Sequence, residues 1–306
     1  MRITLKQMAV FDAIARLGSV VKASEELSVS QSAVSMALSE LESQLGMPLF
    51  NRVHRRLLLN EEGRRLQPQV RSVLLGVRDV ERWSDKAPIE GTIRIGASSM
   101  IGNYLLPAVC ARFLATHPGV RLSLLVLPTA EVVQKVDDFS IDLAFIETPT
   151  IRSSLHMTRW LEDELAVLCG PMHRLAKRRR IDPGHLENET WYLQQQGSVT
   201  RTFFTRAMLQ HVNSIRIGLE TNSIETIKRA LAGGMGIGCL SRRYVEEELR
   251  GGSLCELKVR DLHITRTLSI ASRKDVVQGQ VSSEFIQFTI DYYRNQQSGS
   301  GRSRPS

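Results

Sequence analysis

The sequence lacks the features that would place the chain in a membrane, outside the cell or around a metal ion. Its four cysteines (Cys110, Cys169, Cys239 and Cys255) form no C-x-x-C pair and have no histidine at metal-ligand spacing. We therefore expect reduced thiols and neither a metal nor another cofactor. No apolar run approaches the roughly 20 residues of a membrane span, and residues 1–7 turn polar too early for a secretory signal. These absences favour a soluble cytoplasmic protein with no membrane partner.

The motifs of common enzyme classes are also missing. Neither Ser98 nor Ser198 stands in a G-x-S-x-G nucleophile elbow, and no H-E-x-x-H zinc motif occurs. The glycines of residues 233–238 lack the G-x-G-x-x-G spacing and the preceding strand of a dinucleotide site. More simply, they end a helix and turn the chain into a strand. We expect no catalytic residues, and hence no enzyme.

What the chain does have is size and positive charge. Its 306 residues, of which 42% are hydrophobic, suffice for about two domains with a full core. The net charge of +8 favours a polyanionic partner. Double-stranded DNA is the first candidate.

Three short helices are predicted within the first 46 residues. Apolar residues recur at spacings of three and four over residues 5–18, 20–27 and 31–45. Ser19 can cap the second helix, and Gly46 can end the third. Such a trio, with the short turn Ser28-Val29-Ser30, is typical of a helix-turn-helix.

The third helix carries the candidate DNA-reading residues. Its first turn presents hydrogen-bonding side chains that can reach base edges in a major groove, namely Ser30, Gln31, Ser32 and Ser35. The alternative is that they form only a solvated helix face.

Two short strands and a long helix are expected next. Residues 47–59 predict a wing with a basic turn that could lie along phosphates or enter a minor groove. The basic residues are Arg52, His54, Arg55 and Arg56. A solvated charge run is the alternative. Asn60 can then cap a helix over residues 61–85, whose continuous apolar stripe favours pairing with a copy of itself.

After residues 87–91 the pattern changes to alternating strands and helices, which predicts two α/β lobes with parallel sheets. The predicted strands are 92–96, 121–127, 142–146, 164–169, 236–240 and 265–272, and the predicted helices are 101–116, 131–139, 200–211, 224–232, 243–250 and 281–293. The end of the chain is too polar and Gly/Ser-rich to pack.

Each lobe has a loop that opens a helix with hydroxyl side chains. Residues 96–103 and 196–201 would aim backbone N–H groups into one cleft, which favours a small anion. The candidate residues of these loops are Ser98, Ser99, Met100, Gly197, Ser198, Thr200 and Arg201. The serines could instead be ordinary helix caps.

Thr129, Glu147 and Asn222 should border the same cleft. A carboxylate near a bound anion repels it unless one of the two carries a proton or Arg201 lies between them. Glu147 therefore either accepts a hydrogen bond from a protonated oxyanion or serves as a structural acceptor for backbone N–H groups.

The chain resembles the LysR-type transcriptional regulators over residues 1–293. The specific segments are Ser30-Gln31-Ser32-Ala33-Val34-Ser35, Leu41-Glu42, Leu45-Gly46 and Leu49-Phe50 with Arg52. Asn60 and Glu62 depart from the usual Thr and Ala of the family, although Asn caps a helix as well as Thr does. The resemblance implies an N-terminal all-α winged helix-turn-helix and long linker helix, followed by a two-lobed α/β effector domain like the periplasmic binding proteins. It also implies a homodimer through the linker helix, a homotetramer of two dimers and an effector between the lobes.

The expected domains follow from these patterns. The DNA-binding domain would span residues 1–59, the linker (dimerisation) helix and hinge 60–90, the effector domain 91–295 and a disordered tail 296–306. Lobe I would combine 91–162 with 267–295, and lobe II would comprise 163–266.

The effector lobes resemble, more narrowly, the sulfite-sensing branch of the family that controls sulfur metabolism. The similar segments are residues 97–107, 145–147, 160–165, 222–223 and 238–243. The loop at residues 127–129 and Val199 depart from that pattern, which leaves open a different small metabolite such as a carboxylate or an amino-acid derivative. A solute-binding receptor for a transporter is the remaining alternative, and it would show no specific retention of DNA.

Overall fold

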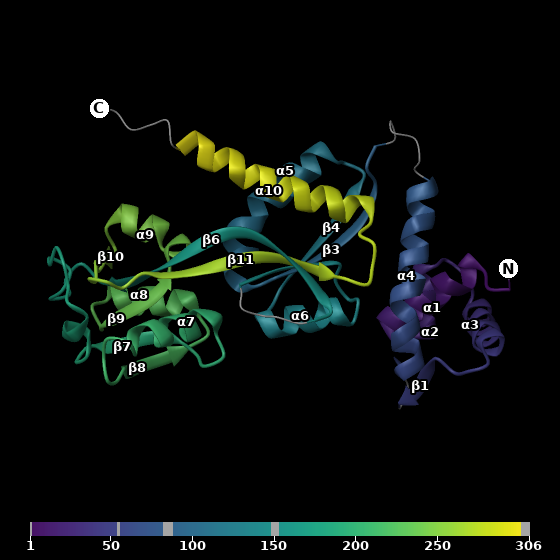
Figure 1. Cartoon of the computed structure of the whole chain (residues 1–306), viewed down its shortest axis with the longest axis horizontal. Helices are drawn as coiled ribbons and strands as arrows, with labels where there is room; N and C mark the ends of the chain where they lie inside the picture. Colours follow the sequence, from purple (N-terminus) through teal and green to yellow (C-terminus); the bar gives the residue numbers. More distant parts are fainter. Residues whose placement is uncertain (1, 54–55, 82–87, 148–152, 301–306) are drawn as a thin grey trace.

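The computed structural model describes residues 2–53, 56–81, 88–147 and 153–300. A helical N-terminal domain lies at one end of the molecule, lobe I of an α/β domain lies in the middle, and lobe II lies at the far end (Figure 1). The N-terminal domain comprises α1 (Leu5–Leu17), α2 (Val20–Glu26), α3 (Gln31–Leu45), β1 (Phe50–Val53) and β2 (Arg56–Leu59). The linker helix α4 (Glu61–Glu81) packs against α1 and leads to lobe I.

Local signals set the ends of the N-terminal helices. Thr4 and Gln7 form a capping box at α1, and Gly18 ends that helix in the left-handed conformation at φ +65°. Ser19 caps α2, and Asn60 caps α4 by accepting a hydrogen bond from the Gly63 backbone N–H at 2.8 Å. These helices confirm the predicted trio and the predicted linker helix.

The α/β domain is built on one mixed sheet with the strand order β4-β3-β5-β11-β6-β9-β7-β8. In lobe I, β3 (Gly91–Ala97) runs parallel to both β4 (Val120–Val126) and β5 (Leu143–Glu147). In lobe II, β7 (Thr190–Gln194) runs parallel to β8 (Arg216–Thr221) and β9 (Ile237–Ser241). The long strands β6 (Leu155–Cys169) and β11 (Ile264–Arg273) pair antiparallel and connect the lobes. The short β10 (Cys255–Glu256) pairs with β6.

Helices cover both faces of the sheet (Figure 1). In lobe I, α5 (Leu106–Thr116) and α10 (Gln280–Ser300) lie on one face, and α6 (Thr129–Asp137) lies on the other. Lobe II adds α7 (Val199–Met208), α8 (Ile224–Ala232), α9 (Glu246–Gly251) and two short helices, η2 (Pro183–Leu186) and η3 (Arg242–Tyr244). No helix in the described residues is both long and apolar enough to cross a bilayer.

The structure corrects several details of the predicted elements. The sheet is mixed and not parallel, because β6 and β11 pair antiparallel and run through both lobes. Strand β6 begins at Leu155, nine residues before the predicted start, and its early residues alternate between apolar and exposed polar. Strands β7 and β8 were not predicted. Helix α10 continues to Ser300 and so includes the first five residues of the predicted tail, because a helix satisfies its own backbone without packing.

The helix predicted over residues 101–116 starts as a π-helical turn, η1 (Ile101–Leu105), before it becomes α5. Pro107 has no N–H to donate to the residue four positions earlier, so the regular hydrogen-bond pattern cannot pass through this point. The widened turn lies shortly after Ser98, the residue that joins β3 to this helix.

Candidate functional sites

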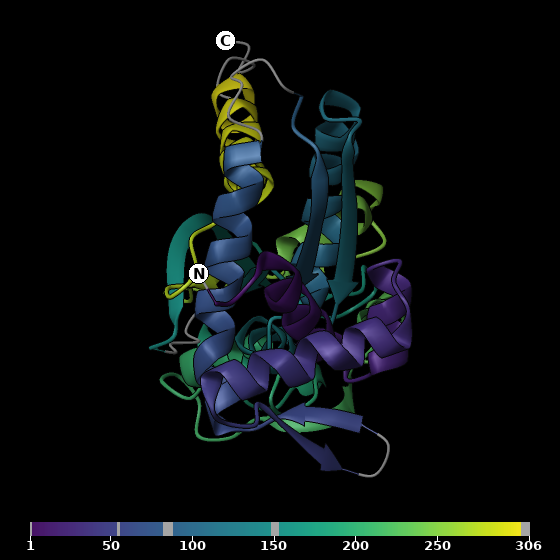
Figure 2. The same cartoon turned by 90° about the vertical axis from the view of Figure 1, so that its right-hand side faces the viewer.

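The predicted DNA-reading residues form an exposed surface at the start of α3. Ser30, Gln31, Ser32 and Ser35 are all exposed, while Val34 on the opposite side of the helix is fully buried. Ser30 caps the helix by accepting a hydrogen bond from the Ala33 N–H at 3.2 Å. Helix α3 and the β1–β2 wing lie on the same side of the N-terminal domain (Figure 2). The geometry leaves these side chains free to approach a groove.

The same face of α3 holds two residues that were not predicted. Met36 is 62% exposed, and Ser39 is also exposed. They follow Ser32 and Ser35 by four residues, and this spacing is the signal that would have identified them. An exposed methionine among serines could make an apolar contact with the methyl group of thymine.

The wing presents part of the predicted basic set. Arg52 on β1 and Arg56 on β2 are exposed, and within the described part of the chain neither has a carboxylate partner. His54 and Arg55 lie outside the described residues. The two described arginines are therefore available to phosphates.

A second site lies between the lobes and is centred on a buried arginine of β11. The Arg266 Nε donates to Asp163 Oδ2 at 2.7 Å, and its Nη1 donates to Thr200 Oγ1 at 2.9 Å. The same Nη1 lies 3.5 Å from Glu147 Oε1. Thr129 in turn donates its hydroxyl to Glu147 Oε2 at 3.0 Å. We call these five residues the interlobe cluster.

Two buried polar atoms at or beside the interlobe cluster lack partners. Arg266 belongs to the cluster, and the Ser98 backbone N–H donates to the Phe145 carbonyl on the strand that ends at Glu147. Ser98 is 4% exposed and Arg266 is 3% exposed. The Ser98 hydroxyl and the Arg266 Nη2 are buried and have no hydrogen-bond partner among the described residues. An unsatisfied buried polar group costs roughly 1–3 kcal/mol, so each of these two atoms would gain from a hydrogen bond to a polar ligand.

A buried tyrosine interacts electrostatically with the cluster. Burial raises the pKa of Tyr244 well above its usual value, the negative charge of Glu147 adds to this shift, and Arg266 opposes it. The phenol is therefore neutral, and the charged groups of this site are the arginine and its carboxylates.

The structure brings together only some of the predicted effector residues. Ser98, Glu147 and Thr200 are buried, and Thr129 is partly buried. Glu147 and Thr200 contact Arg266, and Thr129 contacts Glu147. Met100 packs in the core of lobe I, whereas Ser99, Gly197 and Asn222 are exposed. Ser198 caps α7 and donates to Gln194, as an ordinary cap would.

Arg201 does not lie between Glu147 and the cleft. Its guanidinium contacts Glu220 at 3.5 Å, the Gln194 carbonyl and the Thr205 hydroxyl. Successive helix residues point about 100° apart, so Thr200 and Arg201 cannot both face the cluster. Arg266 supplies the positive charge instead, and Glu147 binds a hydroxyl and this arginine, neither of which is a backbone N–H.

Sequence reasoning missed Arg266, Asp163 and Ser241, although a signal for Arg266 was present. In β11 the buried face includes Ile264, Arg266 and Leu268, so the arginine occupies an inward position of the alternating pattern. Ser241 donates to Asp163 Oδ1 at 2.7 Å and completes that carboxylate's hydrogen bonds.

The cysteines are free and mostly buried. Burial raises the pKa of Cys110 to about 11 and that of Cys239 to about 12. These thiols are therefore protonated at neutral pH and poor nucleophiles. No group of three or more His, Cys, Asp or Glu residues suited to a metal occurs in the part of the chain that the structure describes.

Two known protein families match the chain. Residues 5–64 match the bacterial regulatory helix-turn-helix protein, lysR family, and residues 86–294 match the LysR substrate binding domain. The chain is 41% identical to YeiE of Escherichia coli, an uncharacterized HTH-type transcriptional regulator, over 88% of this chain and 90% of that protein. It is 30% identical to the RuBisCO operon transcriptional regulator of Allochromatium vinosum, over 95% and 96% of the two chains.

A solved structure has the same fold over the whole length. Full-length OxyR from Pseudomonas aeruginosa, determined as a point variant, superposes with a TM-score of 0.77. The match covers 96% of this chain and 95% of that one at 22% sequence identity. The arrangement of helix-turn-helix, linker helix and two lobes is thus shared with an experimental structure.

Proposed function

The chain belongs to the LysR family of transcriptional regulators, and on that premise we propose that its binding to operator DNA is controlled by a small oxyanion held at the interlobe cluster. The two unpartnered atoms, Ser98 Oγ and Arg266 Nη2, carry this proposal. Both are buried, and an oxyanion can accept a hydrogen bond from a hydroxyl and from a guanidinium N–H. Because the helix-turn-helix at residues 5–64 is part of the family match, the alternative of a transport receptor is excluded.

The charge of the cluster restricts the oxyanion. Glu147 and Asp163 oppose the single charge of Arg266, and the partly exposed Arg243 lies 3.8 Å from Asp163. A ligand with two negative charges would be repelled by Glu147, whereas one that carries a proton can donate to it. This favours sulfite with one proton over sulfate, and it agrees with the resemblance to the sulfite-sensing branch.

A different metabolite is the second candidate. The 30% identical relative is a regulator of the RuBisCO operon, which is a different metabolic setting. A monocarboxylate or an amino-acid derivative could also accept from Arg266 and Ser98. Thermal-shift measurements with sulfite and with carboxylates separate these two classes of effector.

We propose that α3 and the wing bind the operator from one face of the N-terminal domain. Gln31, Ser32 and Ser35 would contact base edges with Ser30 at the helix start, and Arg52, His54, Arg55 and Arg56 would contact phosphates or a minor groove. The protein would act in the cytoplasm, where its DNA is. Truncating Gln31 and Ser35 to Ala should reduce operator affinity by roughly tenfold or more, while Gln44→Ala, at the far end of α3, should not.

The linker helix supports a homodimer. Val73 and Val80, seven residues apart on α4, are 43% and 67% exposed. Exposed valines at this spacing form a stripe that a second copy of the helix can cover. We propose a dimer through α4 and a tetramer formed from two such dimers.

A thermal-shift experiment tests the effector assignment. A ligand that binds only the folded protein raises its Tm, so sulfite should raise the Tm and sulfate should not. The paired change Ser98→Ala with Thr200→Ala should abolish the shift, while Ser99→Ala, an exposed neighbour, should leave it intact. If no small oxyanion stabilises the protein, the anion proposal is wrong; stabilisation by a carboxylate alone would favour the second candidate.

A further inference from the structure

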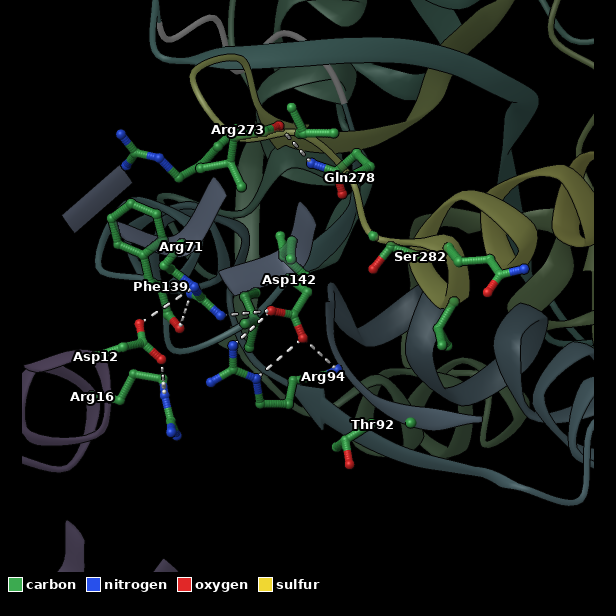
Figure 3. Close-up of a pocket in the computed structure, with 18 of the residues that line it drawn as sticks. Asp12, Arg16, Arg71, Thr92, Arg94, Phe139, Asp142, Arg273, Gln278 and Ser282 are labelled. Atoms are coloured by element: carbon green, nitrogen blue, oxygen red, sulfur yellow. Dashed lines mark hydrogen bonds and ion pairs between the residues drawn. The ribbon is translucent and has the colours of Figure 1, made fainter. Parts of the chain in front are cut away.

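The junction between the N-terminal domain and lobe I contains a second ionic cluster, which none of the proposed activities uses. It lines a cavity of about 570 Å³ whose walls come from α1, α4 and lobe I (Figure 3). Arg16, Arg71, Arg94 and Arg273, which line it, each have a carboxylate partner. Each lining arginine is thus paired with an acid within the protein.

Arg71 of the linker helix is the centre of this junction cluster. Its Nη2 lies 3.2 Å from Asp142 Oδ1 and its Nη1 donates to the Phe139 carbonyl at 3.0 Å, both in lobe I. Its Nε lies 3.5 Å from Asp12 Oδ1 on α1. Figure 3 shows the Arg71 side chain between the two carboxylates. One side chain therefore contacts an acid of the N-terminal domain and an acid of lobe I.

Asp142, the lobe I acid of the junction cluster, is fixed by contacts within lobe I. Asp142 accepts hydrogen bonds from the Arg94 backbone N–H at 2.9 Å and from its Nη2 at 2.6 Å. Burial by itself would raise the pKa of Asp142, but these hydrogen bonds and the charges of Arg94 and Arg71 bring that pKa below its usual value. Arg273 lies 4.3 Å from the centre of the Phe139 ring, against which Arg71 also packs. The acid is ionised and its position is fixed.

Two paired strands connect the junction cluster to the interlobe cluster. Asp142 directly precedes the fully buried β5, and Glu147 ends it. On β11, Arg266 lies near the start and Arg273 at the end, and β11 pairs with β5 from Leu268–Glu147 to Ala271–Ala144. At about 3.3 Å per residue, five residues place the two clusters about 17 Å apart. The two clusters therefore lie at opposite ends of the same pair of strands.

We propose that Arg71 is the positioning residue through which a change at the interlobe cluster reaches the DNA-binding domain of the same subunit. Two paired strands in a packed core move as a unit, so a ligand at Arg266 and Glu147 displaces Asp142 and Arg273 relative to the linker helix. The ion pair of Arg71 with Asp142 is then kept in one lobe arrangement and released in the other. This inference rests on the proposed function, in that it assumes control of DNA binding by the interlobe cluster.

A double-mutant cycle on the full chain tests the connection without an effector. Operator affinity is measured for wild type, Asp142→Asn, Glu147→Gln and the double variant. If the two ends are coupled, the effect of Glu147→Gln should change by about fivefold or more in the Asp142→Asn background. Arg71→Gln, which leaves Arg94 and Asp142 in place, should change the effect of Glu147→Gln in the same way as Asp142→Asn does. It replaces Asp142→Asn in the cycle if that variant does not fold.

The matched control is Asp138→Asn. Asp138 is an exposed acid of the same lobe, four residues earlier, and it accepts a hydrogen bond from the Ser140 N–H. Its combination with Glu147→Gln should be additive. Additivity in the Asp142 and Arg71 cycles as well would overturn the proposal. A failed anion screen would instead count against the proposed effector, since the cycle uses no ligand.

Discussion

The two arginine clusters have similar side chains but differ in whether the central arginine has hydrogen-bond partners for both of its terminal nitrogens. Arg266 and Arg71 each lie between two carboxylates from different parts of the molecule. Both terminal nitrogens of Arg71 donate to protein partners, whereas Arg266 has a buried terminal nitrogen without a partner among the described residues. A satisfied arginine links two domains, and an unsatisfied arginine is prepared for a ligand. The difference separates a structural contact from a binding site in the same chain.

The largest expected effect comes from removing each arginine in turn. Arg266→Met leaves Glu147 and Asp163 buried without their counter-charge and should lower the free energy of unfolding by about 3–5 kcal/mol. Arg71→Met removes a less buried contact and should cost about 1–2 kcal/mol. Urea denaturation measures both. As a control, Arg260→Met removes an exposed pair with Asp182 and should change stability by less than about 1 kcal/mol; equal losses at positions 71 and 266 would contradict the comparison.

Acid should weaken the junction cluster. The pKa of Asp142 is lower in the folded protein than in the unfolded chain, so its contribution to stability is present above the unfolded value of about 4 and is lost as pH falls through the folded value. The stability difference between wild type and Asp142→Asn should therefore be constant from about pH 5 to 7 and shrink below about pH 4. Unfolding measured across this range checks the sign. A difference that grows toward acid pH would refute it.

The smallest single effect is expected at Ser98, and it contrasts with that at Ser241, the other buried hydroxyl of the effector region. Ser98 has no partner, so Ser98→Ala should leave the stability of the ligand-free protein unchanged within about 0.5 kcal/mol or raise it slightly. Ser241 donates to Asp163 at 2.7 Å, so Ser241→Ala should cost about 1.5–3 kcal/mol. Thermal unfolding without ligand measures both variants. A substantial loss for Ser98→Ala would show that its hydroxyl is already bonded.

The helices of the N-terminal domain were predicted with nearly correct ends because their signals are local. Helix α3 begins and ends at the predicted Gln31 and Leu45, with Ser30 as its cap and Gly46 in the left-handed conformation after it. Caps and apolar spacing of three or four act within one or two turns of the chain. The α/β domain was predicted less completely, since β6, β7 and β8 depend on partners far away in the sequence.

The same limit applies to the proposed effector site. Ser98 and Glu147 were proposed because the predicted strands place each at the end of a parallel strand, and the carboxyl ends of such strands meet at one edge. Arg266 was missed because β11 returns from the end of the domain, antiparallel, with a register shift beside Leu268. Arg201 was proposed as the positive charge beside the anion because it follows Ser198 and Thr200 in the sequence. In the structure its side chain points toward Glu220 instead.

The sequence by itself determined the family, the helix-turn-helix and the exposed polar start of α3, because these follow from residues within a few positions of one another. Only the tertiary structure decided which charges meet. Arg266 binds Asp163 across 103 positions of sequence, and Arg71 binds Asp142 across 71. Contacts at such separations depend on strand order and register, which are properties of the assembled sheet and not of any segment alone.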